Sequence, residues 1–282
     1  MTATSDLTGN SEKMCDPSSG RDACGILTRE GGPSIAYRRV PGAAGAGNLP
    51  TVVFLHGLAS DMSGTKATAL AEHAKAAGFP FIRFDMGGHG KSGGRFTACT
   101  VGGWRDDTLA VIDELTEGPL VLVGSSMGGW VALLAAVARP ARVRGLMGIA
   151  AAPDFTETIR SALTEAQRET LERTGEVEIA DDGEALTIGR PLLEEGRHHV
   201  ILRDPIAYLG AVRLVQGMRD ASVPWRTAYT FAEHLQSADV RITLVKDGGH
   251  RLSRPRDLAL LVATLDDLVA QVAGRTPAAP AV

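Results

Sequence analysis

Residues 120–130 read LVLVGSSMGGW, and this stretch decides the fold. An apolar run at 120–123 leads directly into GSSMG at 124–128, which matches the G-x-S-x-G motif, and a segment of helical composition follows. In this context the motif forms a sharp strand-to-helix turn that lifts the central serine above the sheet. Glycines two positions before and after the serine avoid the clash that so tight a turn would cause. The motif therefore predicts Ser126 as a nucleophile, and the alternative is a Gly/Ser-rich turn that only packs.

The same alternation of strand and helix extends in both directions from this turn. The predicted strands are short apolar runs at residues 51–55, 81–84, 120–123, 143–149, 212–216 and 241–245. The predicted helices lie at residues 64–77, 101–115, 127–138, 227–235 and 256–270. Apolar strands that alternate with helices are typical of a mostly parallel sheet covered on both faces. Ahead of them, residues 25–30 and 34–40 flank a Gly-Gly-Pro sequence and predict a β-hairpin.

One inserted segment, residues 154–202, interrupts this alternation after the sixth predicted strand. It contains a capping box at 164–167, which opens an amphipathic helix, and a predicted hairpin around 180–183. Its many acidic residues are typical of a solvated face. We interpret the segment as a lid over the strand ends. Its apolar residues either line a tunnel or pack against the sheet, and they are Ile159, Leu163, Leu171, Leu192 and Leu193.

The rest of the chain divides into a core and two tails. The predicted core consists of residues 23–153 and 203–272, on either side of the inserted segment. Residues 1–22 are rich in Ser, Thr, Asp and Gly and are predicted to be disordered. Residues 273–282 form an Ala/Pro-rich stretch that predicts a flexible tail.

The composition argues against several classes of protein. With 33 acidic against 29 basic residues, the net charge of −4 does not favour a nucleic-acid binder. The longest apolar stretch, residues 129–138, is about half the length of a membrane span, so no stable membrane insertion is expected. Three unpatterned cysteines predict neither a disulfide framework nor a metal site. Residues 1–21 have no apolar core for a secretory signal, so the expected location is cytoplasmic.

A serine nucleophile needs a general base, and the base needs an orienting acid. His250 lies in a loop after the last predicted strand and is the predicted base. Asp220 follows the strand at 212–216 and is the predicted acid. Asp239 precedes its strand, which places it at the wrong edge of a parallel sheet. Asp247 is only three residues from His250, so we expect it to shape that loop.

The negative charge that develops on an attacked carbonyl oxygen needs backbone N–H donors. Met127 follows the serine at the start of a predicted helix, where backbone N–H groups are free to bind an anion. Leu58 lies in the HGL sequence at 56–58, directly after the strand at 51–55. In this type of fold, the loop after that strand supplies the second donor. The predicted oxyanion hole therefore consists of Leu58 and Met127.

Residues 88–93 read GHGKSG and contain two incomplete nucleotide-binding patterns. A phosphate-binding loop of the G-x-x-x-x-G-K-S type needs a glycine where Asp85 stands. A dinucleotide-binding loop needs its third glycine to open a helix at once, but residues 94–99 intervene. A tight loop beside the candidate site is the preferred interpretation, and no cofactor is predicted.

The order of these motifs resembles that of the α/β-hydrolase superfamily over residues 24–272. A narrower resemblance points to the mitochondrial palmitoyl-protein thioesterases that also cleave acyl glucuronides, and to their bacterial relatives. It is carried by FIRFD at 81–85, VGSSMGGW at 123–130, ARP at 138–140, EGRHH at 195–199, GMRDASVPW at 217–225 and LDDL at 265–268. Gly87 departs from the arginine that is common two residues after the aspartate in the superfamily. The polar N-terminus lacks the family's organellar presequence, which favours a cytoplasmic, bacterial-type member.

The resemblance implies an α/β-hydrolase fold with a triad of Ser126, Asp220 and His250. It also implies hydrolysis of acyl thioesters or carboxylic esters through an acyl-enzyme, with no metal or organic cofactor. The partner would be a small-molecule or acyl-protein substrate, and the sequence gives no oligomeric state. Two alternatives stay open: a carbon–carbon bond hydrolase with the same triad, and a non-catalytic receptor on this fold.

Overall fold

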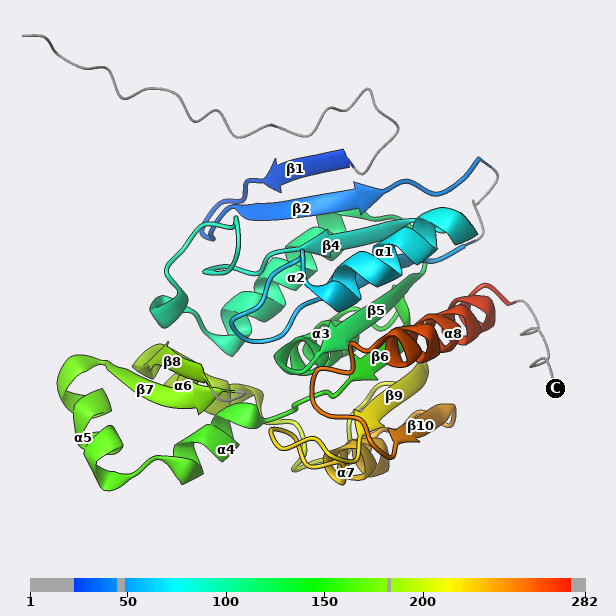
Figure 1. Cartoon of the computed structure of the whole chain (residues 1–282). Coiled ribbons are helices and arrows are strands. Elements are labelled where there is room, and N and C mark those ends of the chain that lie inside the picture. Colours follow the sequence, from blue (N-terminus) through cyan, green and yellow to red (C-terminus); the bar gives the residue numbers. More distant parts are fainter. Residues whose placement is uncertain (1–22, 45–48, 182–183, 275–282) are drawn as a thin grey trace, which may run out of the picture.

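An eight-stranded sheet runs through the centre of the computed structural model, which describes residues 23–44, 49–181 and 184–274 (Figure 1). From edge to edge the strands are β1 (Ala23–Leu27), β2 (Ile35–Val40), β4 (Phe81–Phe84), β3 (Thr51–Leu55), β5 (Leu120–Ser125), β6 (Val143–Ile149), β9 (Ala211–Gly217) and β10 (Val240–Val245). β1 and β2 pair antiparallel, β2 also pairs antiparallel with β4, and the strands from β4 to β10 run parallel. The predicted mostly parallel sheet is confirmed. Of the predicted tails, 1–22 and 273–282, residues 1–22 and 275–282 lie outside the described residues.

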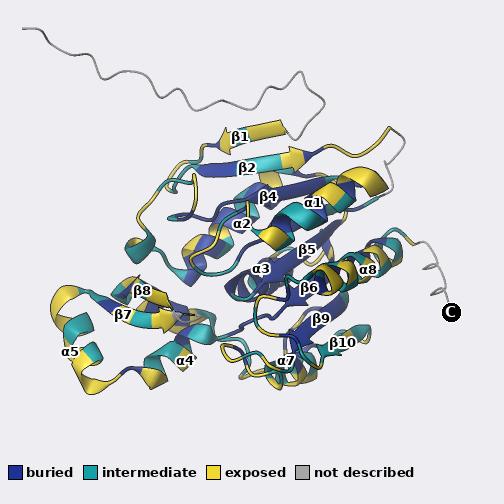
Figure 2. Cartoon of the chain, viewed as in Figure 1, coloured by how far each residue is buried: buried dark blue, intermediate teal, exposed yellow. Residues whose placement is uncertain are grey.

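Helices cover both faces of this sheet and create two apolar cores. On β3, Val52 and Phe54 belong to one core, whereas Val53 and Leu55 belong to the other, because successive side chains of a strand point to opposite faces. The first core is covered by α1 (Thr65–Ala77) and α8 (Pro255–Val272). The second is covered by α2 (Val101–Leu115), α3 (Met127–Ala138) and α7 (Thr227–His234). The central strands are therefore buried along their length (Figure 2), which explains their continuous apolar sequence.

Most element boundaries agree with the prediction. β4, β6, α2 and α3 begin and end at the predicted residues. β5 extends to Ser125, two residues beyond the prediction, because Gly124 and Ser125 still pair with β6. The predicted hairpin forms from β1 and β2, but β1 ends at Leu27 because the chain turns there through a wider loop that includes Gly31, with a φ of 75°. The sheet thus reaches directly to the G-x-S-x-G motif.

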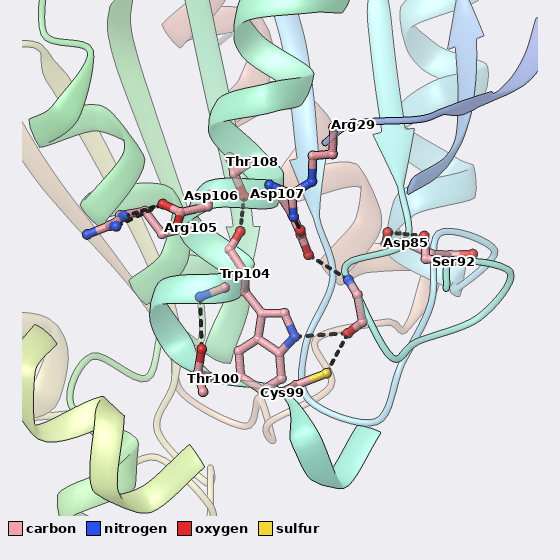
Figure 3. A network of polar contacts seen from close by, with 12 residues as sticks. Arg29, Asp85, Ser92, Cys99, Thr100, Trp104, Arg105, Asp106, Asp107 and Thr108 are labelled. Atoms are coloured by element: carbon pink, nitrogen blue, oxygen red, sulfur yellow. Dashed lines mark hydrogen bonds and ion pairs between the residues drawn. The ribbon is translucent and has the colours of Figure 1, made fainter. Parts of the chain in front are cut away.

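The glycine-rich loop after β4 is a tight turn held by neighbouring elements. Asp85 accepts the N–H of Met62 at 2.7 Å, which joins this loop to the one after β3. Gly87 donates its N–H to Asp107 at 2.7 Å and accepts the indole N–H of Trp104 at 3.0 Å. Figure 3 shows Trp104 and Asp107 within this polar network, at the N-terminal end of α2. The interpretation as a tight loop is confirmed, since no helix opens at its third glycine.

The inserted segment lies between β6 and β9 and stands beside the main sheet (Figure 1). Its elements are α4 (Phe155–Ala162), α5 (Glu165–Thr174), β7 (Glu176–Asp181), β8 (Glu184–Gly189), α6 (Arg190–Glu195) and the 3-10 turn η3 (Gly196–His199). The capping box at Thr164 and Gln167 and the β7–β8 hairpin both form as predicted. The short helices α4 and α6 were not predicted, because six to eight residues carry too little periodicity to identify them.

Several contacts hold the two ends of this inserted segment together and attach it to the core. The two carboxylate oxygens of Asp154 accept the N–H groups of Ile201 and Leu202, both at 2.9 Å, so one side chain joins the two ends of the segment. The Trp130 indole donates to the His199 carbonyl at 3.2 Å. The 3-10 turn η2 (Phe96–Ala98) also packs on β8 and α6. The segment is therefore held in place at its base and along one side.

Candidate active site

The G-x-S-x-G turn places Ser126 in a conformation that L-residues rarely adopt. Ser126 has φ 52° and ψ −121° and precedes the first residue of α3. A Cβ on Gly124 would lie 2.2 Å from the Gly128 carbonyl oxygen. A Cβ on Gly128 would lie 2.4 Å from the carbonyl oxygens of Leu55 and His56. Both glycines are therefore required by close backbone approach, as the sequence predicts.

Replacing Gly128 by alanine is expected to destabilise the fold by about 1–3 kcal/mol, the usual cost of forcing an atom into a packed site. The carbonyl groups that the new Cβ would meet belong to the backbone of the β3 end and cannot rotate away. Gly249→Ala is the matched control, because its Cβ would meet nothing within 4 Å. Urea unfolding measures both. Equal losses of stability in the two variants would contradict this account of the turn.

The structure brings the predicted nucleophile, base and acid together from three separate loops. His250, between β10 and α8, lies with its Nε2 atom 3.1 Å from Ser126 Oγ. Its Nδ1 atom lies 2.8 Å from Asp220 Oδ2, in the loop after β9. The Asp220 side chain is fully buried, whereas 18% of the His250 side chain is exposed. The geometry is that of a nucleophile, a base and an orienting acid in hydrogen-bonded sequence.

Asp220 is fixed by three hydrogen bonds besides the one to His250. Its Oδ1 atom accepts the backbone N–H groups of Ser222 at 2.9 Å and Val223 at 2.8 Å. Its Oδ2 atom also accepts a hydrogen bond from Gln216 Nε2 at 2.8 Å. These donors stabilise the charged carboxylate and hold one oxygen toward the imidazole. Gln216 was not predicted, although a polar residue at the carboxyl end of a mostly apolar strand is a signal that could have identified it.

The two competing acids form ion pairs elsewhere. Asp239 accepts a hydrogen bond from the Arg213 guanidinium at 2.9 Å. Asp247 accepts from Arg254 at 3.1 Å, across the loop that carries His250. Neither aspartate is bonded to the imidazole of His250 in the described part of the chain. The expectations that Asp239 lies at the wrong edge and that Asp247 shapes the loop agree with these positions.

A buried histidine orders the loop that carries the first predicted oxyanion donor. Burial, followed by the charge of His89, lowers the pKa of His56 to about 3, so the ring is neutral. Its Nε2 atom accepts the N–H of Met86 at 3.1 Å, which leaves the ring proton on Nδ1. Nδ1 then donates to the Gly57 carbonyl oxygen at 2.8 Å. This bond orients the Gly57–Leu58 peptide, because the carbonyl and the following N–H point in opposite directions across a trans peptide.

Both predicted oxyanion donors line one pocket together with the serine and histidine. The pocket has a volume of about 910 Å³ and includes Leu58, Ser126, Met127 and His250 in its wall. Met127 is the first residue of α3, so its N–H has no carbonyl partner within the helix. A volume in this range suits a small organic ligand. The pocket therefore offers a carbonyl group both a nucleophile and nearby N–H groups.

The inserted segment supplies much of the apolar wall of this pocket, through Phe155, Ile159, Ala162, Ile179 and Leu186. Of the five apolar residues proposed as tunnel-lining or sheet-packing, only Ile159 lines the pocket. The other four, Leu163, Leu171, Leu192 and Leu193, pack in or against the apolar core. A helical pattern identifies the inward face of a segment but does not tell whether that face meets a sheet or a cavity. Phe155, Ile179 and Leu186 were therefore not predicted as pocket residues.

The described residues contain neither a metal-ligand cluster nor a membrane-spanning helix. Within residues 23–44, 49–181 and 184–274, no three His, Cys, Asp or Glu side chains come together in a metal-binding arrangement. Across the same ranges, each helix is too short or too polar to cross a lipid bilayer.

Comparison with known proteins identifies close relatives. The profile of the serine aminopeptidase S33 family (Hydrolase_4) matches residues 48–178. The mitochondrial palmitoyl-protein thioesterase ABHD10 of Mus musculus is 39% identical over 255 residues, which cover 89% of this chain and 84% of the relative. The solved structure of mouse α/β-hydrolase domain-containing protein 10 aligns with a TM-score of 0.81 at 39% identity, over 89% of this chain and 99% of the other. A putative hydrolase from Agrobacterium vitis S4 aligns with a TM-score of 0.82 at 35% identity, over 88% and 98%.

These comparisons correct one expectation. The predicted cytoplasmic location is contradicted, because the relatives from mouse, cattle and human are named mitochondrial proteins. The prediction rested on the polar composition of residues 1–21, in which no targeting signal was recognised. Failure to recognise a signal is not a positive indication of any compartment.

Proposed function

The chain belongs to the ABHD10 family of α/β hydrolases and is a hydrolase of ester or thioester bonds, and from this premise we propose that Ser126, His250 and Asp220 form its catalytic triad. The observation that carries the proposal is the hydrogen-bonded sequence of the three side chains, at 3.1 Å and 2.8 Å, with Ser126 and His250 in the wall of the pocket. No metal or organic cofactor takes part in the proposed reaction.

The proposed reaction has two halves. Ser126 Oγ attacks the acyl carbonyl while His250 Nε2 takes its proton, and the resulting imidazolium gives that proton to the leaving sulfur or oxygen. Water then attacks the acyl-enzyme, with His250 again acting as the base, and the carboxylic acid formed from the acyl group is released. Asp220 holds the ring and stabilises its charged form. The N–H groups of Leu58 and Met127 stabilise the oxyanion in both halves.

The apolar wall supports an acyl group of medium to long chain as the substrate. Phe155, Ile159, Ile179 and Leu186 come from α4 and the β7–β8 hairpin, and all line the pocket that contains Ser126. Ile179 and Leu186 are directly paired across the hairpin and so present one continuous apolar surface. We propose that the inserted segment acts as the lid of an acyl-binding site. The names of the mammalian relatives, palmitoyl-protein thioesterases, point to the same class of substrate.

Measuring kcat/KM against acyl length, from C2 to C16 with one leaving group, tests this proposal. If the chain enters the apolar pocket, each added methylene is expected to contribute up to ~0.8 kcal/mol, or about fourfold, until the pocket is full. Leu186→Ala should lower kcat/KM for long chains more than for acetyl. Thr187→Ala is the matched control, because Thr187 is the adjacent, exposed residue of β8 and does not line the pocket. A steady fall from C2 to C12 with monomeric substrates would contradict the acyl assignment.

The two alternatives can be separated from this function. A fluorophosphonate probe is expected to label the protein at Ser126, and a receptor without a reactive serine would remain unlabelled. The relatives are named thioesterases, which also favours an enzyme over a receptor. Strong turnover of a vinylogous diketone, without ester or thioester hydrolysis, would instead indicate a carbon–carbon bond hydrolase.

A further inference from the structure

A lysine lies in the wall of the proposed catalytic pocket. Lys66, in the first turn of α1, lines the same cavity as Ser126 and His250. Its ammonium group donates a hydrogen bond to the Arg251 carbonyl oxygen at 2.6 Å. Arg251 directly follows His250 and also lines the pocket. This contact therefore attaches the ammonium group to the loop that carries the proposed base.

The surroundings of Lys66 disfavour its positive charge in the absence of an anion. Burial lowers the pKa of the Lys66 ammonium to about 8, and the nearby charge of Arg251 acts in the same direction. The acceptor at 2.6 Å is a neutral carbonyl oxygen, which orients the ammonium but does not neutralise it. Two acidic residues, Asp61 and Glu184, also line the pocket. An anion bound beside Lys66 would relieve this unfavourable environment through a charge-assisted hydrogen bond.

The proposed reaction of the triad indicates which part of the substrate lies near Lys66. His250 must give its proton to the leaving group, so that group lies against the loop of residues 249–251. Lys66 is bonded to this same loop. The apolar wall that accepts the acyl chain comes instead from the inserted segment. On this reasoning the acyl chain lies against the inserted segment and the leaving group lies beside the loop to which Lys66 is bonded.

We propose that Lys66 is a specificity-determining residue that favours substrates whose leaving group carries a carboxylate or a phosphate. The inference rests on the proposed function of the site and adds the chemical class of the leaving group. Lys66 has no part in the bond-making steps, so its effect is measured as a ratio between charged and uncharged thioesters.

Four S-octanoyl thioesters test the charge preference. Their thiols are 3-mercaptopropionate (carboxylate), 2-mercaptoethyl phosphate (phosphate), 2-mercaptoethanol (neutral) and thiocholine (cationic). The quantity measured is kcat/KM for each charged thioester divided by that for the neutral one. In Lys66→Met the anionic ratios are expected to fall about tenfold, the lower range for a hydrogen bond to a charged group, and the cationic ratio is expected to rise. The carboxylate and phosphate thioesters show which anion the site prefers.

Two variants and one titration control this experiment. Lys66→Arg keeps the charge and should retain the anionic preference, and Lys75→Met changes an exposed lysine on the same helix and should leave every ratio unaltered. For the wild-type protein, the anionic ratio is expected to fall as the pH rises through about 8, because Lys66 then loses its charge. The other charged or titratable groups of the pocket wall are Asp61, Glu184, His250 and Arg251, and all of them are unchanged in Lys66→Met.

The possible outcomes separate this inference from the proposed function. If the folded wild-type protein hydrolyses the thioesters but the ratios are the same in Lys66→Met, the inference is overturned and the function stands. If Lys66→Met does not fold, an anionic ratio that stays constant from pH 7 to 9.5 in the wild type overturns it equally. If the folded wild-type protein hydrolyses none of the thioesters, the proposed function fails and the inference fails with it.

Discussion

Replacing Ser126 by alanine is expected to lower kcat on the order of a million-fold while leaving the fold intact. The loss has this size because a triad without its nucleophile retains only the binding and oxyanion contributions. The fold should persist, since the carbonyl oxygen of residue 126 keeps its hydrogen bonds from Gly129 at 2.8 Å and Ala152 at 3.1 Å. The measurements are kcat with a thioester substrate and the denaturation midpoint.

Ser125→Ala is the matched control for this variant. It makes the same change one residue earlier, at the end of β5, on a side chain that is buried and lies in the wall of the same pocket. Its kcat should stay within a few-fold of the wild type. Residual activity of Ser126→Ala above a few per cent, with contamination excluded, would remove Ser126 from the reaction, and so would an equal loss in Ser125→Ala.

Replacing Asp220 by asparagine is expected to lower kcat by about four orders of magnitude, as is known for the same change in a serine protease. The geometry gives the reason. The oxygen that accepts the N–H groups of Ser222 and Val223 must remain an oxygen, so the amide nitrogen takes the position that faces His250. An N–H donor at that position forces His250 Nδ1 to become an acceptor. The ring proton then moves to Nε2, where it blocks acceptance of the Ser126 proton.

Asp239→Asn and Asp247→Asn are the controls, because each removes one carboxylate charge without touching the imidazole. Their carboxylates pair with Arg213 and Arg254, so the expected cost is in stability rather than in kcat. Steady-state kinetics and thermal unfolding of the three variants separate these effects. Similar drops in kcat for Asp220→Asn and Asp247→Asn would contradict the assignment of the acid.

The parts of the site that the sequence predicts are those fixed by local chemistry or by chain order. The turn around Ser126 is local, because two glycines and a preceding strand are enough to define it. Asp220 and His250 can be predicted from their places in the chain. Each follows a predicted parallel strand, and the carboxyl ends of parallel strands meet at one edge of the sheet. The placement of these residues within hydrogen-bond distance agrees with that expectation.

The parts that could not be predicted depend on which neighbour a side chain meets. Leu192 and Leu193 are as apolar as Ile179 and Leu186, yet the first two pack in the core and the second two line the pocket. Only the packing of α6 and of the hairpin decides between these environments. Lys66 is a similar case, because a lysine near the start of a helix does not show whether its side chain meets solvent or lines a cavity.

The bond pattern of Asp154 has a consequence for how such enzymes diversify. One carboxylate holds the N–H groups of residues 201 and 202, so the two ends of the inserted segment are held together. When the ends of a loop are already together, doubling its length costs only about 0.6 kcal/mol in closure entropy. Insertions, deletions or a different segment between residues 154 and 201 are therefore expected to disturb the triad little. In such an architecture, substrate range can diverge in evolution while the bond-breaking chemistry stays the same.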